Sequence, residues 1–183
     1  MTSAFFGLQM ALELPRGDQL RDRLSEVVRE LRGSTSVPTQ RTSWTRASAL
    51  LVEAIPTARL ATWDLIREAA EAEYEDWASG LEAMALWPLA DFGADGRYVL
   101  VSVIMLVTAD STADQTLGDV CDIPERDWLR RSTYQKLASA PPMLNFTHVL
   151  CSGMYLAPRP DLVGFSHAAL TGEGFEYLDP VQD

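Results

Sequence analysis

The chain has 183 residues, of which 47% are hydrophobic and 22% charged, proportions typical of a globular protein of one domain. Its net charge of −11 is unevenly placed, since residues 60–96 hold nine acidic and one basic side chain and residues 160–183 hold five acidic and none basic. Nucleic acids and anionic membranes bind clustered cations, so this balance argues against both as the main partner.

The N-terminal segment and the cysteines indicate the compartment. Residues 1–14 lack the basic start and the cleavage site of a signal peptide, and Gln9 and Glu13 interrupt their apolar run. Cys121 and Cys151 are too few for a disulfide framework. We therefore expect a cytoplasmic protein with reduced thiols and without direct insertion into a membrane.

Three segments have the pattern of β-strands. Residues 6–14 alternate apolar and polar side chains, as a strand with one buried face does. Residues 98–108 are almost entirely apolar and include four valines, which favours a strand buried on both faces at the centre of the sheet. The third strand is expected over residues 144–156, where one parity holds Leu144, Phe146, His148, Leu150, Met154 and Leu156.

Three helices are expected between the first and the second of these strands. Asp18 suits the N-cap of a helix that continues to Leu31, and a polar loop is expected over residues 34–42. Ser43 is the expected cap of a second helix, which ends near Pro56. The third helix is expected to run from Thr62 or Asp64 to Leu86.

A fourth helix is expected to begin at Pro124 and to place Trp128 on its inner side, after a loop over residues 111–122 with one helical turn. Together these elements predict a single α+β domain over residues 1–183. In it, about four helices cover a small mixed sheet of about three strands, residues 6–14, 98–108 and 144–156.

The acidic run on the third expected helix is the candidate binding site. Glu68, Glu71 and Glu75 stand at i, i+3 and i+7, so they share one helical face, with Leu65, Ala69 and Trp77 turned inward. A solvated face, a docking surface for a basic partner and a metal site are the alternatives. No histidine occurs in residues 1–147, so we expect no metal there.

The two histidines and the two cysteines have no spacing typical of a zinc site. His148 has the apolar parity of its strand and is expected in the core, whereas Cys151 has the opposite parity, so the two are not expected to form a catalytic pair. The glycines match neither a phosphate-binding loop nor a dinucleotide fingerprint. We therefore assign no catalytic residue, metal or cofactor.

The order of several segments is also similar to that of a known family. The segments, within residues 6–181, are Leu8-Gln-Met-Ala-Leu12, Leu20 to Leu31, Ala49-Leu-Leu-Val-Glu-Ala54, Tyr98–Val107, Met154-Tyr-Leu-Ala-Pro158 and Ala168-Ala-Leu170 to Tyr177-Leu-Asp-Pro180. This order resembles an uncharacterised domain family found mainly in cyanobacteria and plastids, usually behind a glycine-rich, membrane-anchored segment.

The chain departs from that family in two respects. Its last strand has Cys151-Ser-Gly-Met-Tyr155 where the family tends to have an acidic residue and tryptophan, and the sequence contains no glycine-rich, membrane-anchored segment. The resemblance implies a fold but no site residue, since the family has no established catalytic residues.

These observations lead to three hypotheses on function. The first is a non-enzymatic interaction module that docks another protein with a basic surface through Glu68, Glu71 and Glu75. The second is a small-ligand-binding or sensory domain with a pocket between the sheet and the tryptophan-bearing helices. The third is an unrecognised hydrolase or transferase. The oligomeric state does not follow from the sequence.

Overall fold

Five strands and six α-helices form within residues 2–34, 36–84, 96–159 and 162–183, the parts of the chain that this computed structural model describes. The strands are β1 (Ser3–Glu13), β2 (Ala58–Ile66), β3 (Tyr98–Thr108), β4 (Val149–Ala157) and β5 (Asp179–Pro180). The helices are α1 (Gln19–Gly33), α2 (Val37–Ala54), α3 (Ala70–Met84), α4 (Thr112–Cys121), α5 (Arg131–Ala138) and α6 (His167–Leu170). The 3-10 turns within the described residues are η1 (Ile55–Thr57), η3 (Glu125–Asp127), η4 (Pro141–Met143) and η5 (Phe146–His148).

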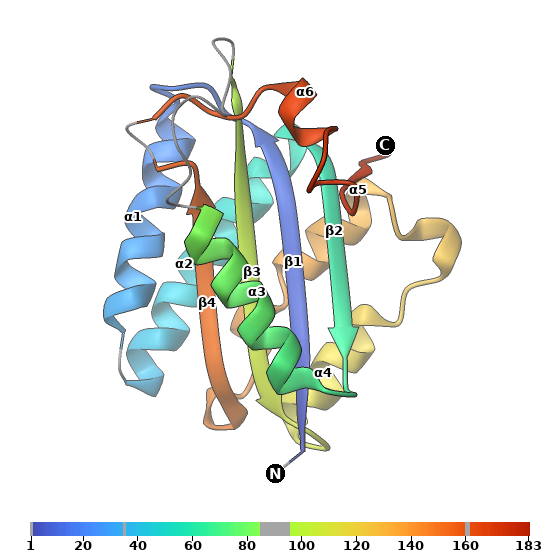
Figure 1. Cartoon of the computed structure of the whole chain (residues 1–183). Helices are drawn as coiled ribbons and strands as arrows, with labels where there is room; N and C mark the ends of the chain where they lie inside the picture. The colour runs from blue at the N-terminus through green and yellow to red at the C-terminus, as the bar shows by residue number, and fades with distance from the viewer. Residues whose placement is uncertain (1, 35, 85–95, 160–161) are drawn as a thin grey trace.

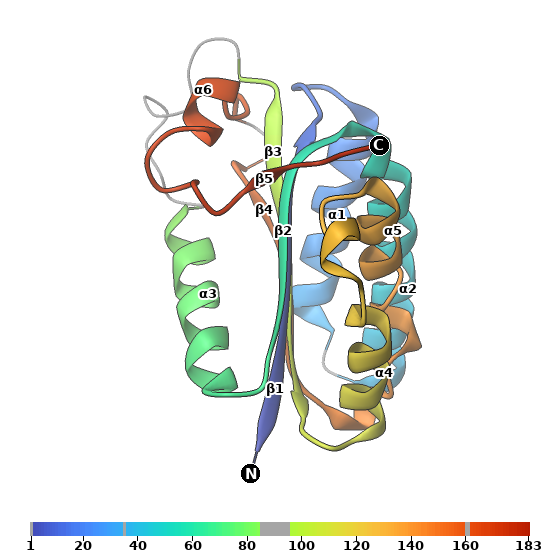
Figure 2. The ribbon, with the colours of Figure 1, turned by 90° about the vertical axis from the view of Figure 1, so that its right-hand side faces the viewer.

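The strands form one antiparallel sheet in the order β4-β3-β1-β2-β5 (Figure 1). Seen along its plane, the sheet has α1, α2, α4 and α5 on one face and α3 and α6 on the other (Figure 2). The predicted single α+β domain is confirmed. The predicted counts of three strands and four helices are too low, and the sheet is antiparallel, not mixed.

Strand β1 lies in the middle of the sheet, between β3 and β2. Phe6 and Leu8 belong to the main core, the apolar cluster on the α1–α2 face that also includes Trp44 and Val103. On the other face Gly7 gives room to α3, because a Cβ there would lie only 3.0 Å from the ring of Trp77. A strand with one exposed face was predicted here, and that is wrong, since packing on both sides buries every residue from Ser3 to Leu12.

The prediction of a buried strand over residues 98–108 is confirmed. Strand β3 pairs with β1 along its whole length, from Tyr98 opposite Glu13 to Thr108 opposite Ser3, and with β4 on its other side. It is an interior strand, one place from the middle. The third predicted strand begins only at Val149, because the preceding residues form η4 and η5. His148 therefore precedes the strand and is partly exposed, so its predicted place in the core is wrong.

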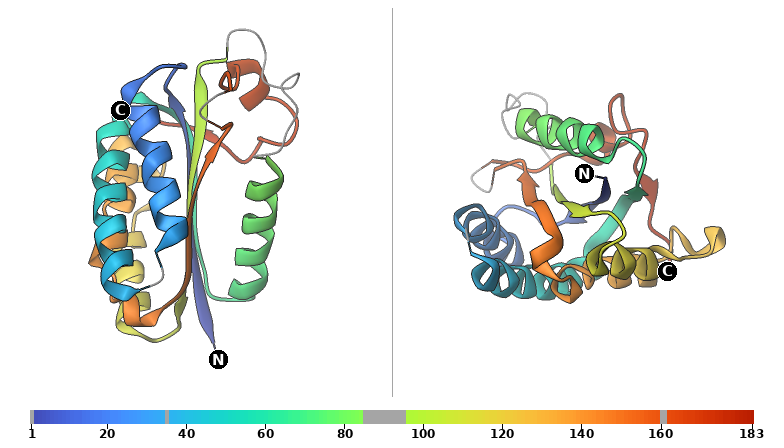
Figure 3. Two further views of the ribbon diagram at one scale, coloured as in Figure 1. Left: turned by 90° about the vertical axis from the view of Figure 1, so that its left-hand side faces the viewer. Right: turned by 90° about the horizontal axis from the view of Figure 1, so that it is seen from below.

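Helices α1 and α2 pack side by side over the main core (Figure 3). The predicted cap of α1 is confirmed, since the Asp18 carboxylate accepts a hydrogen bond from the Leu20 N–H at 2.8 Å. The predicted loop over residues 34–42 and the cap at Ser43 are wrong. Ser36 caps α2, and the Ser43 hydroxyl instead lies 3.2 Å from the Ser34 hydroxyl.

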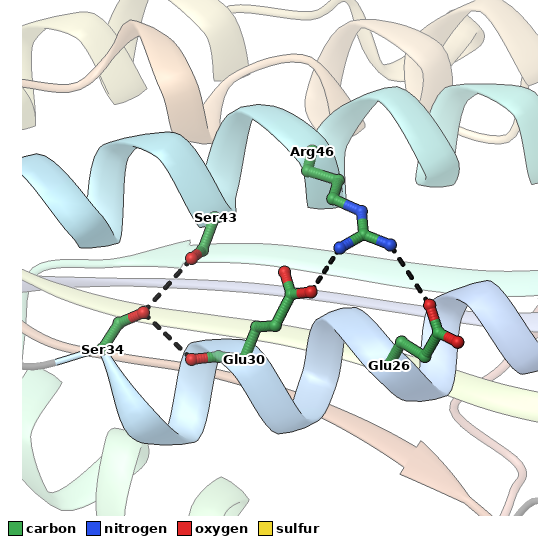
Figure 4. A network of polar contacts seen from close by, with 5 residues as sticks. All are labelled: Glu26, Glu30, Ser34, Ser43 and Arg46. Atoms are coloured by element: carbon green, nitrogen blue, oxygen red, sulfur yellow. Dashed lines mark hydrogen bonds and ion pairs between the residues drawn. The ribbon is translucent and has the colours of Figure 1, made fainter.

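Polar contacts hold the outer sides of these two helices together (Figure 4). Arg46 of α2 forms ion pairs with Glu26, at 3.2 Å, and with Glu30 of α1. These groups are about half exposed, so each pair adds little stability and mainly fixes the register of the helices.

The prediction of a long helix from Thr62 or Asp64 is wrong for the first half of that segment. Residues 58–66 form β2, and α3 begins at Ala70 after Ala69, whose φ of 54° turns the chain. Leu65 therefore belongs to the sheet, and Ala69 is exposed. The predicted end near Leu86 lies outside the described residues.

The segment after β3 is more helical than predicted. Ser111 caps α4, a helix of 10 residues where a loop with one turn was expected. After Pro124 the chain makes only the turn η3, and α5 begins at Arg131. Trp128, predicted to lie inside, has 44% of its surface exposed.

Candidate functional site

The predicted acidic residues lie at the start of α3. Glu68 precedes the helix, whereas Glu71 and Glu75 lie within it, one turn apart, and all three are exposed. Glu71 accepts a hydrogen bond from the Ser3 hydroxyl at 3.4 Å. Within the described part of the chain, no basic side chain forms an ion pair with any of the three. Trp77 does turn inward, with its ring 5.4 Å from that of Phe5.

The histidines and cysteines are spread over the fold. Cys151 is exposed on β4 opposite Leu106, and His167 lies against Tyr98, near the other end of β3. In the described ranges no three His, Cys, Asp or Glu side chains are grouped to hold a metal ion.

A groove that sequence reasoning missed runs beside the outer edge of β2. The strand β5 pairs only with Leu60 and Ala61, so the edge from Thr62 to Ile66 has no strand partner among the described residues. On the α4–α5 face this edge borders a groove of about 780 Å³. Its lining residues are Ala61, Thr62, Trp63, Asp64, Leu65, Arg67, Gly118, Asp119, Cys121, Asp122, Trp128, Leu129, Tyr134 and Asp179.

Two tryptophans give this groove an apolar wall. The rings of Trp63, from β2, and Trp128, after η3, meet edge to face with centroids 5.9 Å apart. The indole N–H of Trp128 donates to the Ile123 carbonyl at 2.8 Å, which fixes the ring although it is exposed. An exposed, oriented indole is a common anchor in protein interfaces.

The charge of the groove is negative. Asp64, Asp119, Asp122 and Asp179 line it, and the sole basic residue among its described lining residues is Arg67. The Arg67 guanidinium forms an ion pair with the buried Asp114 carboxylate at 2.9 Å, so its charge is largely compensated. The remaining carboxylates favour a cationic ligand.

The inner end of the groove holds a thiol and a phenol. Burial raises the pKa of Cys121 to about 12, and burial likewise raises the pKa of Tyr134 to about 12. Both groups therefore stay protonated and neutral near pH 7. The arrangement offers apolar surface and hydrogen-bonding groups inside the groove, with negative charges at the rim.

Comparisons with known proteins do not identify the chain: no family model, no curated protein and no solved structure matches it. The resemblance to the cyanobacterial and plastid family thus stays an expectation from the order of segments. In the described residues, none of the helices has both the length and the apolar character needed to cross a membrane.

Proposed function

We propose that the chain is a non-enzymatic docking module that binds an extended, basic segment of another protein along the free edge of β2. The observation that supports this most is the edge from Thr62 to Ile66, which has no strand partner among the described residues, beside a groove with two tryptophans and four aspartates. Within this edge the Leu65 N–H donates to the Asp64 carboxylate at 2.9 Å. Strand addition to a sheet edge supplies backbone hydrogen bonds, and pockets beside the edge select the side chains of the added strand.

The chain already uses the same edge for its own tail. Asp179 and Pro180 pair with Ala61 and Leu60, and the Val181 N–H donates to the Arg59 carbonyl at 2.9 Å. The edge is therefore able to accept an added strand, and beyond Ala61 no described strand pairs with it. Asp64 on that edge disfavours pairing with a second copy of this acidic chain, whereas a basic segment gains by the same charge.

The predicted acidic residues fit this proposal as steering charges. Glu68 follows β2 by two residues, and Glu71 and Glu75 continue from it along α3. Exposed carboxylates that lie beside the groove, and not in it, attract a basic partner during its approach and contribute less to the stability of the complex.

The experiment uses a peptide that alternates valine and lysine, with a valine–glutamate peptide as its counterpart. We expect the lysine peptide to bind saturably, more weakly as salt rises, and the glutamate peptide not to bind. The double variant Asp119→Asn/Asp122→Asn should weaken binding by between about twofold and thirtyfold, since each exposed charge pair contributes about 0.2–1 kcal/mol. The triple variant Glu68→Gln/Glu71→Gln/Glu75→Gln should mainly slow association.

Glu125→Gln is the matched control, since Glu125 is exposed near the groove but does not line it. Its binding should equal that of the wild-type chain. Equal affinity for the two peptides, or no effect of the Asp119 and Asp122 changes, contradicts docking at the β2 edge.

A small-ligand-binding domain is the second candidate function. The observation that favours it is a separate cleft between the sheet and α3, whose wall includes Trp77.

A further inference from the structure

The cleft under α3 opens on the sheet face opposite to the β2 groove. It measures about 520 Å³ and lies between α3, the strands β1 and β2, and the segment before β5. In Figure 2, α3 stands beside this face of the sheet, with α6 and the C-terminal segment above it. The helix contributes one continuous face to the cleft, at spacings of three and four residues: Glu73, Asp76, Trp77, Gly80, Leu81 and Met84.

A row of polar side chains crosses the floor of the cleft. Gln9 of β1 stands directly opposite Ser102 of β3 and Thr62 of β2, so the three share this face of the sheet. Apolar clusters lie on both sides of the row, one around Leu100 and the other around Phe5. Buried polar groups lower the stability of the fold unless they are hydrogen-bonded, so the hydrogen-bond partners of this row decide what it contributes.

Gln9 is paired on one side only. It is 2% exposed, and its Nε2 donates to the Ser102 hydroxyl at 2.8 Å. Its Oε1 has no hydrogen-bond donor among the described residues, and Gln9 lines the cleft. The floor thus presents a carbonyl oxygen that can accept a hydrogen bond from a bound molecule.

The rim of the cleft is negative and its wall is aromatic. Asp64, Glu73 and Asp76 line the cleft, and its described lining includes no basic side chain. Glu73 accepts a hydrogen bond from the Trp77 indole N–H at 2.9 Å, which orients that ring. Tyr177 adds a second ring. Aromatic faces beside carboxylates are suited to organic cations.

We propose that this cleft binds a small organic amine, with its ammonium group at the rim carboxylates and its apolar body against Trp77 and Tyr177. The Gln9 Oε1 accepts a hydrogen bond from the end of the ligand that reaches the floor. The volume is in the range of small-molecule sites, and the lack of cations among the described lining residues disfavours an anionic ligand. This proposal does not rest on docking at the β2 edge: the two sites share only Thr62 and Asp64, and α3, Gln9 and Tyr177 line the cleft alone.

The test compares amines with carboxylates of the same shape. Calorimetric titrations use tyramine and 6-amino-1-hexanol as probes, with 3-(4-hydroxyphenyl)propionate and 7-hydroxyheptanoate as their anionic counterparts. We expect saturable binding of at least one amine and no binding of the carboxylates. Asp76→Asn should weaken amine binding about fivefold, the usual size of one partly exposed charge pair. Glu82→Gln is the matched control and should bind as the wild type, since Glu82 is exposed on the same helix but does not line the cleft.

Gly80→Leu separates binding from folding. A Cβ on Gly80 meets no heavy atom within 4 Å, and leucine is a better helix former than glycine, so the variant should melt no lower than the wild type. Its side chain occupies the cleft wall, and amine binding should fall at least tenfold. Binding of neither amine to the wild type, equal binding of the carboxylates, or unchanged binding by a folded Gly80→Leu variant overturns the proposal.

Discussion

The two cysteines differ in the surroundings of their sulfur atoms. Cys121 ends α4 and packs against the main core, where burial raises its pKa to about 12. Cys151 is exposed on the outer strand β4. Only the thiolate form reacts with alkylating agents, so burial and a raised pKa both protect Cys121.

This contrast predicts the outcome of alkylation with iodoacetamide near pH 8. One thiol of the native protein, Cys151, should react quickly, and the Cys151→Ser variant should react at least about tenfold more slowly, because at that pH the thiolate form of Cys121 is rare. Intact-mass spectrometry over time measures both rates. Denatured protein, in which both thiols react, is the control. Rapid alkylation of Cys121 in the folded Cys151→Ser variant disagrees with its burial.

Single residues of the candidate sites were only partly predictable from the sequence. Spacing predicts that Glu68, Glu71 and Glu75 share one helical face. Glu71 and Glu75 are exposed on α3, because helical periodicity is local, whereas Glu68 precedes the helix. The meeting of Trp63 and Trp128 is not predictable in this way, since it depends on two segments 65 residues apart in the chain. Gln9 is one of the polar residues in an alternating strand, a position typical of a solvent-facing side chain. It is buried because α3 and the C-terminal segment cover this face of the sheet.

Among the elements, β2 was the main error of prediction. Leu60, Thr62 and Asp64 alternate with Ala61, Trp63 and Leu65, which agrees with a strand, but Leu65 and Ala69 also continue a helical spacing into α3. Pairing with β1 decides between the two, and strand formation depends more on such neighbours than on intrinsic preference. The buried strand β3 was predictable because its apolar run is long and unbroken.

The ends of three elements meet at Glu13, the last residue of β1. Its carboxylate accepts hydrogen bonds from Arg97, just before β3, at 3.1 Å and from Arg59 of β2 at 3.0 Å. These hydrogen bonds, from Arg97 first and Arg59 second, lower the pKa of Glu13 below its ordinary value of 4.5. A lowered folded-state pKa stabilises the fold at pH values above the unfolded pKa, and this stabilisation is lost as pH falls through the folded pKa.

Glu13→Gln should therefore lower the melting temperature at pH 7 by at most about 3 °C, as expected for pairs near the surface. The difference from the wild type should shrink as the pH falls below the ordinary value of 4.5 and through the lowered pKa of Glu13, because the wild-type carboxylate then becomes protonated. Thermal unfolding of both proteins over a pH series measures this. Glu125→Gln, which changes a carboxylate without an ion pair in the described structure, should show no such trend. If the difference in melting temperature between Glu13→Gln and the wild type stays constant with pH, the effect of the substitution does not come from these ion pairs.

At the scale of the whole molecule, the two faces of the sheet are covered unequally. Four helices close one face over the main core, whereas α3 and the C-terminal segment divide the other between them. The groove at the β2 edge and the cleft under α3 lie on opposite faces of the same strand, with Thr62 and Asp64 lining both.

The integrity of the sheet depends on its interior strands, and a charge in β3 tests this. Val103 is 1% exposed and lies between Leu8 of β1 and Met154 of β4, within the main core. A carboxylate placed there loses its hydration without gaining a partner, which costs several kcal/mol out of a typical total stability of about 5–15 kcal/mol. Val103→Asp should therefore abolish soluble folding.

Val37→Asp provides the matched control for the same chemical change. Val37 is 43% exposed at the first residue of α2, where a negative charge interacts favourably with the helix dipole. This variant should keep the circular dichroism spectrum and the melting temperature of the wild type. Because both variants add one aspartate to a valine position, the difference between them reports burial and not net charge. A soluble Val103→Asp protein with an unchanged spectrum and melting temperature contradicts the interior position of β3.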